Sequence, residues 1–319
     1  MIINRIISEI KKATKIAISF HKRVDGDSLG SSFALYLALT DLKKNPYIIC
    51  EEKLPSNLRF LPKAQTIESK FFQNIQNGTE LLITLDCGSV SRLSGDFNFS
   101  NKDYTVINLD HHGTNDMFGD INYVDANASS MGEIVYQILK GLNANIDVKI
   151  ATYLYTSIIS DTGNFKFQNT TSLTHGIAGD LLNSGIDHTE ITRRVLNYNS
   201  FLNTKFVGKV LLSLEYIHPR VVFMTIFKRD LDNFGLEDFS TSDVIDFGLN
   251  IENIEVSIVA KEVDEGFKIS LRSKNIVDVK SLAETFNGGG HVRASGCVIN
   301  SKDVEEVKDI LLMELKKEI

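Results

Sequence analysis

Short apolar runs alternate with longer helical patterns along the first half of the chain. The apolar runs are rich in aliphatic and β-branched residues and predict strands over residues 15–20, 46–50, 81–86 and 104–109. Apolar residues three and four positions apart predict helices over residues 28–42, 133–140 and 148–160. Because strands that alternate with helices are typical of a parallel sheet, we predict an α/β domain here.

The pattern changes after a polar helical stretch. Beyond it, apolar runs predict strands over residues 221–227, 254–261 and 266–272, followed by a helix over 279–286, a loop over 287–296 and an amphipathic helix from Lys302. A chain of 319 residues is long enough for about two domains. We therefore predict a first domain over residues 1–187, a helical linker over 188–206 and a smaller α/β domain over 207–319.

Composition narrows the class of function. The chain has 34 Lys and Arg against 41 Asp and Glu, a formal charge of −7, so it lacks the basic balance of proteins that bind long duplex DNA or anionic membranes. No apolar stretch approaches the ~20 residues of a membrane-spanning helix. Glu9 and Lys11 interrupt the segment where a signal peptide would be apolar. We expect a cytoplasmic protein with no membrane partner.

Aspartates and histidines gather where the elements of the first domain are predicted to end. They lie in residues 21–27 (HKRVDGD), 85–88 (LDCG), 108–112 (NLDHH) and 160–163 (SDTG). A single DGD is most often a turn, and a single pair of histidines is most often structural. Loops at the carboxyl ends of parallel strands converge, however, so the four clusters together predict one shared site.

The carboxylates of this predicted site need counter-charge. Asp25, Asp27, Asp86 and Asp161 would repel one another strongly if they met without cations. Oxygen-rich ligation with one or two imidazoles suits Mn²⁺ or Mg²⁺ better than zinc. Two such ions, roughly 3.5–4 Å apart, recur in enzymes that hydrolyse phosphate esters. We therefore predict two divalent ions, with Mn²⁺ preferred and Mg²⁺ as the alternative.

A glycine run in the second domain predicts an anion site. A histidine and an arginine follow it, in the order Gly288, Gly289, Gly290, His291 and Arg293. Three glycines alone most often form a tight turn. With the two cationic residues beside them, their backbone N–H groups can cradle a phosphate while a guanidinium binds its oxygens. Arg272 and Ser273, at the end of a predicted strand, would join this surface.

These motifs resemble those of the DHH phosphoesterases, a family named after the triplet that stands here as Asp110, His111 and His112. The likeness covers nearly the whole chain. Residues 21–31, 85–93, 108–115 and 160–167 are similar to the four motifs of the family, and residues 270–273 and 288–296 to its DHH-associated domain. The resemblance implies a parallel-sheet domain and a smaller domain with a mixed sheet, with a cleft between them.

The resemblance also implies roles for the matched residues. One ion would be held by His21, Asp25 and Asp86, and the other by Asp27, Asp86, His111 and Asp161, with water or hydroxide between the ions as nucleophile. Asp110 would orient a metal-bound imidazole. His112 would contact the scissile phosphate or protonate the leaving 3′-oxygen. Arg92 would contact substrate, although an exposed arginine after a strand is more often a salt-bridge partner.

A pocket with few cations favours a short substrate, since proteins that follow a polymer carry a long basic track. Within the family this favours an enzyme that cuts short oligoribonucleotides to 5′-monophosphates and converts 3′-phosphoadenosine 5′-phosphate (pAp) to AMP, over the RecJ-type exonucleases. A phosphodiesterase for pApA or cyclic di-AMP, a pyrophosphatase and a non-catalytic RNA- or nucleotide-binding module are the alternatives. The resemblance further implies a homodimer.

Overall fold

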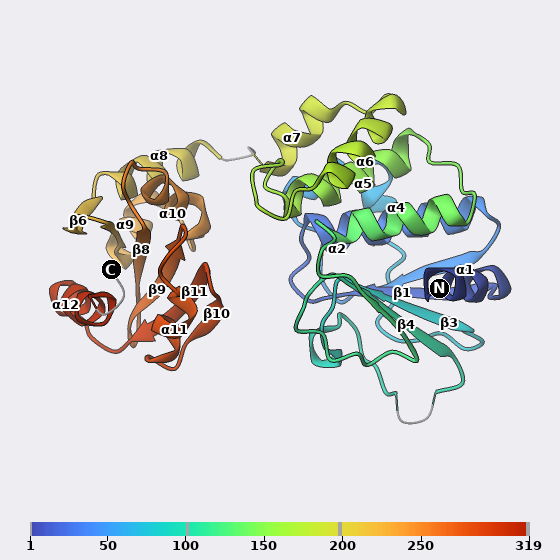
Figure 1. Ribbon diagram of the computed structural model, residues 1–319, viewed down its shortest axis with the longest axis horizontal. Coiled ribbons are helices and arrows are strands. Elements are labelled where there is room, and N and C mark those ends of the chain that lie inside the picture. The colour runs from blue at the N-terminus through green and yellow to red at the C-terminus, as the bar shows by residue number, and fades with distance from the viewer. Residues whose placement is uncertain (1, 100–101, 197–199, 317–319) are drawn as a thin grey trace. The chain divides into compact units, whose positions relative to one another are not determined.

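The computed structural model describes residues 2–99, 102–196 and 200–316. The chain divides into two compact units, Met1–Tyr198 and Asn199–Ile319 (Figure 1). This division lies inside the stretch that we predict as a linker. Among the described residues, no helix is long and apolar enough to cross a membrane.

The first unit is built on a parallel sheet of five strands in the order β2-β1-β3-β4-β5, which confirms the predicted α/β class. Its elements are α1 (Ile2–Lys12), β1 (Lys15–Phe20), α2 (Gly26–Asp41), β2 (Asn45–Ile49), η1 (Ser56–Leu58), α3 (Ala64–Glu68), β3 (Leu81–Leu85), η2 (Val90–Arg92), β4 (Thr105–Asp110), β5 (Ile121–Val124), α4 (Met131–Gly141), α5 (Val148–Asp161), α6 (Ser172–Asn183) and α7 (His188–Leu196). The predicted strands and helices of this unit are confirmed, each end lying within two residues of its expected place. Strand β5 and helices α3 and α6 were not predicted; α6 contains two glycines, which weaken a helical pattern.

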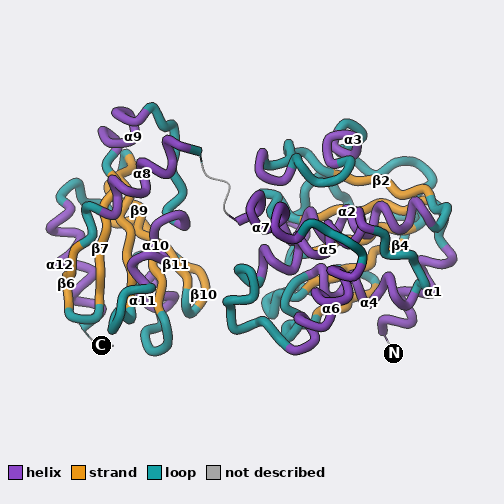
Figure 2. The backbone as a smooth tube through the Cα atoms, turned by 90° about the horizontal axis from the view of Figure 1, so that it is seen from above, coloured by secondary structure: helices purple, strands orange, loops and turns teal. Residues whose placement is uncertain are grey.

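The two faces of this sheet are covered differently. Side chains alternate along a strand, so that Ile16 and Ile18 of β1 enter the larger core while Ala17 enters a small cluster on the opposite face. Figures 1 and 2 show helices α2, α4 and α5 together on the face of the larger core. The small cluster is covered by loop residues such as Phe97 and Phe118. Because α2 and α4 each follow a parallel strand, both begin at the carboxyl edge of the sheet.

The second unit contains a mixed sheet of six strands in the order β10-β11-β9-β8-β7-β6, in which only β7 and β8 pair in parallel. Its elements are α8 (Phe201–Leu211), β6 (Glu215–His218), β7 (Val221–Ile226), α9 (Lys228–Phe234), α10 (Ser242–Leu249), β8 (Val256–Val263), β9 (Gly266–Ser273), α11 (Val279–Glu284), β10 (Gly289–His291), β11 (Ala294–Ile299) and α12 (Val304–Leu315).

The glycine run is not the loop that we predict. Residues 289–291 form β10, which pairs antiparallel with β11 in a hairpin. Glycine has a low intrinsic preference for strands, but pairing with a neighbouring strand overrides it here. The polar helical stretch resolves into α7, whose Ile191 packs in the core of the first unit, and α8, whose Phe206 packs in the second.

Candidate active site

The three central strands of the parallel sheet bring predicted site residues to its carboxyl edge. His21 follows β1, Asp86 follows β3 and His111 follows β4. Asp25 caps the start of α2, where its carboxylate accepts the Ser28 N–H at 2.9 Å. Aspartates at the start of α2 and the end of α5 complete the group, so all four sequence clusters meet as predicted.

The first donor cluster surrounds His21. Its Nε2 lies 3.4 Å from Asp25 Oδ2 and 3.2 Å from Asp86 Oδ2. The other ring nitrogen, Nδ1, is 2.7 Å from the carbonyl oxygen of Lys22. Because a carbonyl only accepts, Nδ1 carries the proton, and in the neutral ring Nε2 presents a lone pair to two carboxylates.

The second donor cluster surrounds His111. Its Nε2 lies 3.4 Å from Asp27 Oδ2, 3.4 Å from Asp86 Oδ1 and 3.3 Å from Asp161 Oδ2. Its Nδ1 is 3.3 Å from the carbonyl oxygen of Ala128, so the same argument leaves a lone pair toward the carboxylates. Asp86 therefore contacts both histidines, one with each oxygen.

These clusters fit a pair of divalent cations. Ligand atoms lie within 4.8 Å of one another in three sets of described residues: His21 with Asp25 and Asp86, Asp27 with His111 and Asp161, and Asp86 with His111 and His112. Asp86 Oδ1 is buried and accepts no hydrogen bond from the described part of the chain, a costly state for a carboxylate oxygen. A cation beside it would remove that cost, and oxygen with imidazole is the ligand set of Mn²⁺ or Mg²⁺.

The closely packed carboxylates shift the pKa values of these groups. Burial disfavours protonation of both histidines, but the carboxylates beside them outweigh burial and raise the pKa of His21 to about 11 and that of His111 to about 12. Burial and the negative charge of Asp27 raise the pKa of Asp161 to about 8. Burial would also raise the pKa of Asp86, but the two imidazoles outweigh it and hold that pKa below its usual range. Protons thus supply the positive charge that metal ions would bring.

Asp27 is held in place by donors from α4 and α5. Its Oδ2 accepts the N–H of Met131 at 2.9 Å, and its Oδ1 accepts the N–H of Gly132 at 3.3 Å and the hydroxyl of Ser157. The N-terminus of α4, where the partial positive charge of a helix lies, therefore binds a carboxylate. Sequence reasoning missed Ser157, although it lies one helical turn before an assigned ligand and so faces the same way.

Glycines allow α2, α4 and α5 to come this close. A Cβ on Gly30 would lie 2.9 Å from the Cβ of Ser157, and a Cβ on Gly132 only 2.2 Å from its hydroxyl oxygen. A Cβ on Gly26 would lie 1.8 Å from the Ser160 hydroxyl oxygen. The glycines of the DGDxxG segment are thus required by helix packing, which places Asp27 within reach of its donors.

Asp110 is buried and saturated with donors. Its Oδ1 accepts the backbone N–H groups of His111 at 2.8 Å and His112 at 3.2 Å and lies 2.8 Å from His112 Nδ1, while Oδ2 accepts the Asn115 amide at 2.6 Å. Asp110 therefore orients the ring of His112. The hydrogen bond with Asp110 raises the pKa of His112, and the side chain, 33% exposed, keeps Nε2 for a ligand.

The loop after His21 is held from two sides. The Lys22 N–H donates to the Arg92 carbonyl at 2.7 Å. Arg23 adopts a left-handed conformation with φ of 64°, and its N–H donates to Glu52 at 2.7 Å. No local pattern in the sequence marks Glu52 for this task. The side chain of Arg92 is exposed and has no ion pair among the described residues, so it is free to meet a ligand.

In the second unit, Arg293 is used by the fold. Its guanidinium donates to the carbonyl oxygens of Val277 at 2.7 Å and Asn275 at 2.5 Å, and lies 3.5 Å from the Ser273 hydroxyl. Ser273 is buried and donates to the Val277 carbonyl at 2.7 Å. Both predicted phosphate ligands thus hold the turn that follows β9.

The other predicted residues of this region are more accessible. A Cβ on Gly288 would lie 2.3 Å from a backbone oxygen of β11, and Gly290 has a φ of 145°, so the hairpin itself requires these two glycines. Gly289 is exposed with open space around it. His291 is exposed and Arg272 half-exposed, and neither side chain makes a hydrogen bond or ion pair with another described residue.

Comparisons with known proteins agree with this geometry. The DHH family, N-terminal domain, matches residues 15–158, and the DHHA1 domain matches residues 220–317. The bifunctional oligoribonuclease and PAP phosphatase NrnA of Thermus thermophilus is 32% identical over 317 residues, 99% of this chain and 94% of that protein. The Bacillus subtilis protein of the same name is 28% identical over 93% of each chain.

A solved structure shares the whole fold. The crystal structure of an exopolyphosphatase-related protein from Bacteroides fragilis matches with a TM-score of 0.87 at 26% identity, over 99% of this chain and 96% of that one. Together with the full-length likeness to the Thermus protein, this match extends the similarity through both units. The chain belongs to the DHH family of phosphoesterases and carries a DHHA1 domain.

Proposed function

We propose that this protein is a metal-dependent phosphodiesterase that degrades short oligoribonucleotides to nucleoside 5′-monophosphates and dephosphorylates pAp to AMP. The observation that carries the proposal is the pair of donor clusters joined by Asp86, an arrangement suited to two divalent ions. The names of the Thermus and Bacillus relatives, oligoribonuclease and PAP phosphatase, support the substrate class.

The ligands are proposed as a shared set, with Mn²⁺ as the preferred ion and Mg²⁺ as the alternative. One ion would be held by His21, Asp25 and Asp86, and the other by Asp27, Asp86, His111 and Asp161. When bound, such a pair supplies Lewis-acid stabilisation of phosphate charge and makes water a stronger nucleophile at neutral pH.

The chain itself supplies orientation and a proton. Asp110 engages Nδ1 of His112 and raises its pKa, so that His112 can hold a proton at the partly exposed Nε2. A proton there serves the leaving 3′-oxygen of an RNA chain or of pAp, or donates a hydrogen bond to a phosphate oxygen. Ser157 and the start of α4 keep Asp27 in one orientation throughout.

Substrate contacts are proposed for the accessible groups. The side chains of Arg92 in the first unit and of Arg272 and His291 in the second make no hydrogen bond or ion pair with a described residue, and Gly289 is exposed. Arg293, Ser273, Gly288 and Gly290 would act by shaping the turn and hairpin beside them. So few cations on a chain of charge −7 suit a substrate of a few nucleotides.

The test is Mn²⁺-dependent hydrolysis of four substrates: pAp, a 5′-phosphorylated diribonucleotide, a five-residue RNA and a long RNA of about two dozen nucleotides. Chromatography identifies the products. We expect fast release of monophosphates from the short substrates and little action on the long one. Rapid, processive loss of the long RNA would contradict the proposal.

The same assay separates the alternatives. Preference for pApA or cyclic di-AMP over pAp and short RNA would identify the protein as a dinucleotide phosphodiesterase. Preference for pyrophosphate would identify it as a pyrophosphatase. RNA binding with neither bound Mn²⁺ nor turnover would select a non-catalytic module. We also propose a homodimer that acts in the cytoplasm; light scattering on the purified protein and fractionation of cells test these two points.

A further inference from the structure

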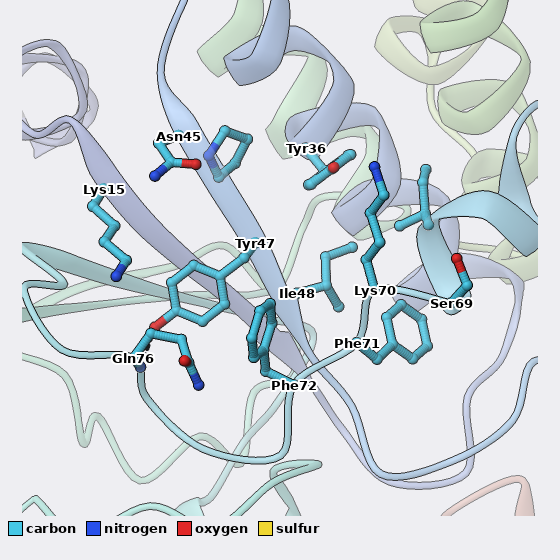
Figure 3. A pocket seen from close by; sticks show the side chains of 12 residues that line it. Lys15, Tyr36, Asn45, Tyr47, Ile48, Ser69, Lys70, Phe71, Phe72 and Gln76 are labelled. Atoms are coloured by element: carbon cyan, nitrogen blue, oxygen red, sulfur yellow. Dashed lines mark hydrogen bonds between the residues drawn. The ribbon is translucent and has the colours of Figure 1, made fainter.

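A cavity of about 650 Å³ lies in the first unit at the edge strand β2. Its walls come from the start of β1, from α2, β2 and α3, and from the segment that follows α3, over residues 69–76. Figure 3 shows the side chains of Tyr47, Phe72, Lys70 and Lys15 around it. The volume lies within the range of about 300–1,000 Å³ that is usual for small-molecule sites.

The cavity contains a fixed aromatic surface. The rings of Tyr47 and Phe72 lie edge to face, with centroids 5.2 Å apart and an angle of 78°. The Tyr47 hydroxyl accepts the Gln76 N–H at 2.9 Å and bonds the Thr79 hydroxyl at 2.7 Å, so its ring cannot turn away. The Phe72 N–H donates to the Ile48 carbonyl at 3.0 Å, and the Phe72 carbonyl accepts the Cys50 N–H at 2.9 Å. The Phe72 side chain nevertheless stays 38% exposed. An apolar ring held at an open cavity offers a face on which another ring can stack.

The charged residues that line the cavity are cationic. They are Lys15 and Lys70, and none of the described residues that line it is an aspartate or a glutamate. Lys15 Nζ donates to the Asn77 carbonyl at 2.6 Å, which leaves two of its protons, and Lys70 is exposed with no ion pair among the described residues. In Figure 3 the two lysines lie on either side of the Tyr47 and Phe72 rings. Aromatic faces with cations beside them match a ligand that combines a flat ring with an anionic group.

The cavity is separate from the metal-ligand clusters. Lys15 and Asn45, which line it, are the first residues of β1 and β2, whereas the ligands follow the carboxyl ends of strands. Helix α2 joins the two places, since it begins at the aspartates of the first motif and carries Tyr36 into the cavity wall. We propose that this cavity is a second nucleotide site, which stacks the base on the exposed ring of Phe72, held in place by Tyr47, and binds the phosphate through Lys70.

Photolabelling of the full-length protein with 8-azidoadenosine 5′-monophosphate tests the assignment, because mass spectrometry of the labelled peptides identifies the site. Labelling is done in EDTA, so that no metal-dependent binding contributes. We expect label in peptides that contain residues 36, 47 or 69–76, with competition by unlabelled AMP. Label confined to the second unit or to the His21 and Asp86 peptides would overturn the proposal without touching the proposed enzymatic function.

Variants sharpen the test through AMP affinity, measured by calorimetry in EDTA. Phe72→Leu keeps an apolar side chain but removes the stacking face and is expected to weaken binding at this site about tenfold, as is Lys70→Glu. Lys63→Glu reverses an exposed charge outside the cavity and is expected to leave the affinity unchanged. If Phe72→Leu and Lys70→Glu bind AMP as tightly as the unaltered chain, the site is not here. Capture of a peptide or of a second copy by this edge, with no effect of AMP, would also contradict the proposal.

Discussion

Two regions of this molecule were predicted to contact phosphate, and they differ in what their polar side chains contact within the chain. In the first unit, His21 and His111 each place Nδ1 against a backbone carbonyl and Nε2 against carboxylates, which a proton or a metal ion on Nε2 would neutralise. In the second unit, Arg293 and Ser273 give their protons to the turn after β9. Arg293 and Ser273 therefore stabilise the fold, whereas the crowded carboxylates of the first unit, with the buried Oδ1 of Asp86 accepting no hydrogen bond from the described residues, mark where cations belong.

The largest effect is expected from removing a ligand charge. Asp86→Asn removes the negative charge of the side chain that both clusters share. We therefore expect hydrolysis of pAp and short RNA to fall below detection and bound Mn²⁺ to be lost. Asp161→Asn is expected to abolish hydrolysis as well, with loss of one of the two bound Mn²⁺ ions. The measurements are turnover and Mn²⁺ stoichiometry after dialysis. Asp41→Asn, an exposed aspartate at the end of α2, is the matched control, and near-full activity in both ligand variants would refute the assignment.

A smaller effect is expected from Ser157, which contacts a proposed ligand but not the ions themselves. Ser157→Ala removes a buried donor to Asp27 and leaves the two backbone donors in place. We expect Mn²⁺ affinity to fall about 10- to 100-fold, measured by calorimetry, with the protein still folded. Thr156→Val removes a neighbouring buried hydroxyl that donates to its own helix and should leave the affinity unchanged. Equal losses in both variants would mean that α5 is merely disturbed.

In the second unit, stability rather than binding is expected to change first. Arg293→Ala strips donors from two carbonyls and should cost about 1–3 kcal/mol of unfolding free energy, measured by urea denaturation. The Arg272 side chain makes no hydrogen bond or ion pair within the described part of the chain, so Arg272→Ala should change stability by less than about 0.5 kcal/mol while raising KM for pAp. The reverse result, a stable Arg293→Ala with a raised KM, would return Arg293 to direct phosphate binding.

The smallest effect concerns pH. Glu255 accepts the backbone N–H groups of Asn275 and Val277 at 2.9 and 3.1 Å, in the turn that Arg293 holds through its carbonyls. Burial would raise the pKa of Glu255, but these hydrogen bonds outweigh burial and lower it. The stabilisation is therefore present above the ordinary glutamate pKa and is lost as pH falls through the lowered one.

Hydrogen exchange of the 275–277 amides is the measurement for this prediction. Relative to Glu255→Gln at the same pH, the unaltered chain should protect these amides more at pH 7, and the difference should shrink as the solution is acidified below about pH 4. A difference that does not depend on pH would exclude the carboxylate charge as its cause.

Local patterns were strong enough to predict the central strands and the helices that carry the ligands. β1 and β3 are short, mostly apolar and almost wholly buried, and a ligand residue directly follows each of them. The β10 hairpin was missed because its pairing with β11 is not visible in a run of glycines. Glu52 was missed because its contact with Arg23 links two loops that no local pattern connects.

The amino-acid sequence by itself determined the central strands of the first unit, the helices that carry ligands, the convergence of the four acidic clusters and the resemblance to the DHH family, because periodicity and motif order are local properties of the chain. Only the tertiary structure decided which nitrogen of each histidine faces the carboxylates, that Asp110 serves His112 and that Arg293 is used by its own turn. These outcomes depend on donors and acceptors brought together from distant segments, and each buried polar group takes whichever partner packing places beside it.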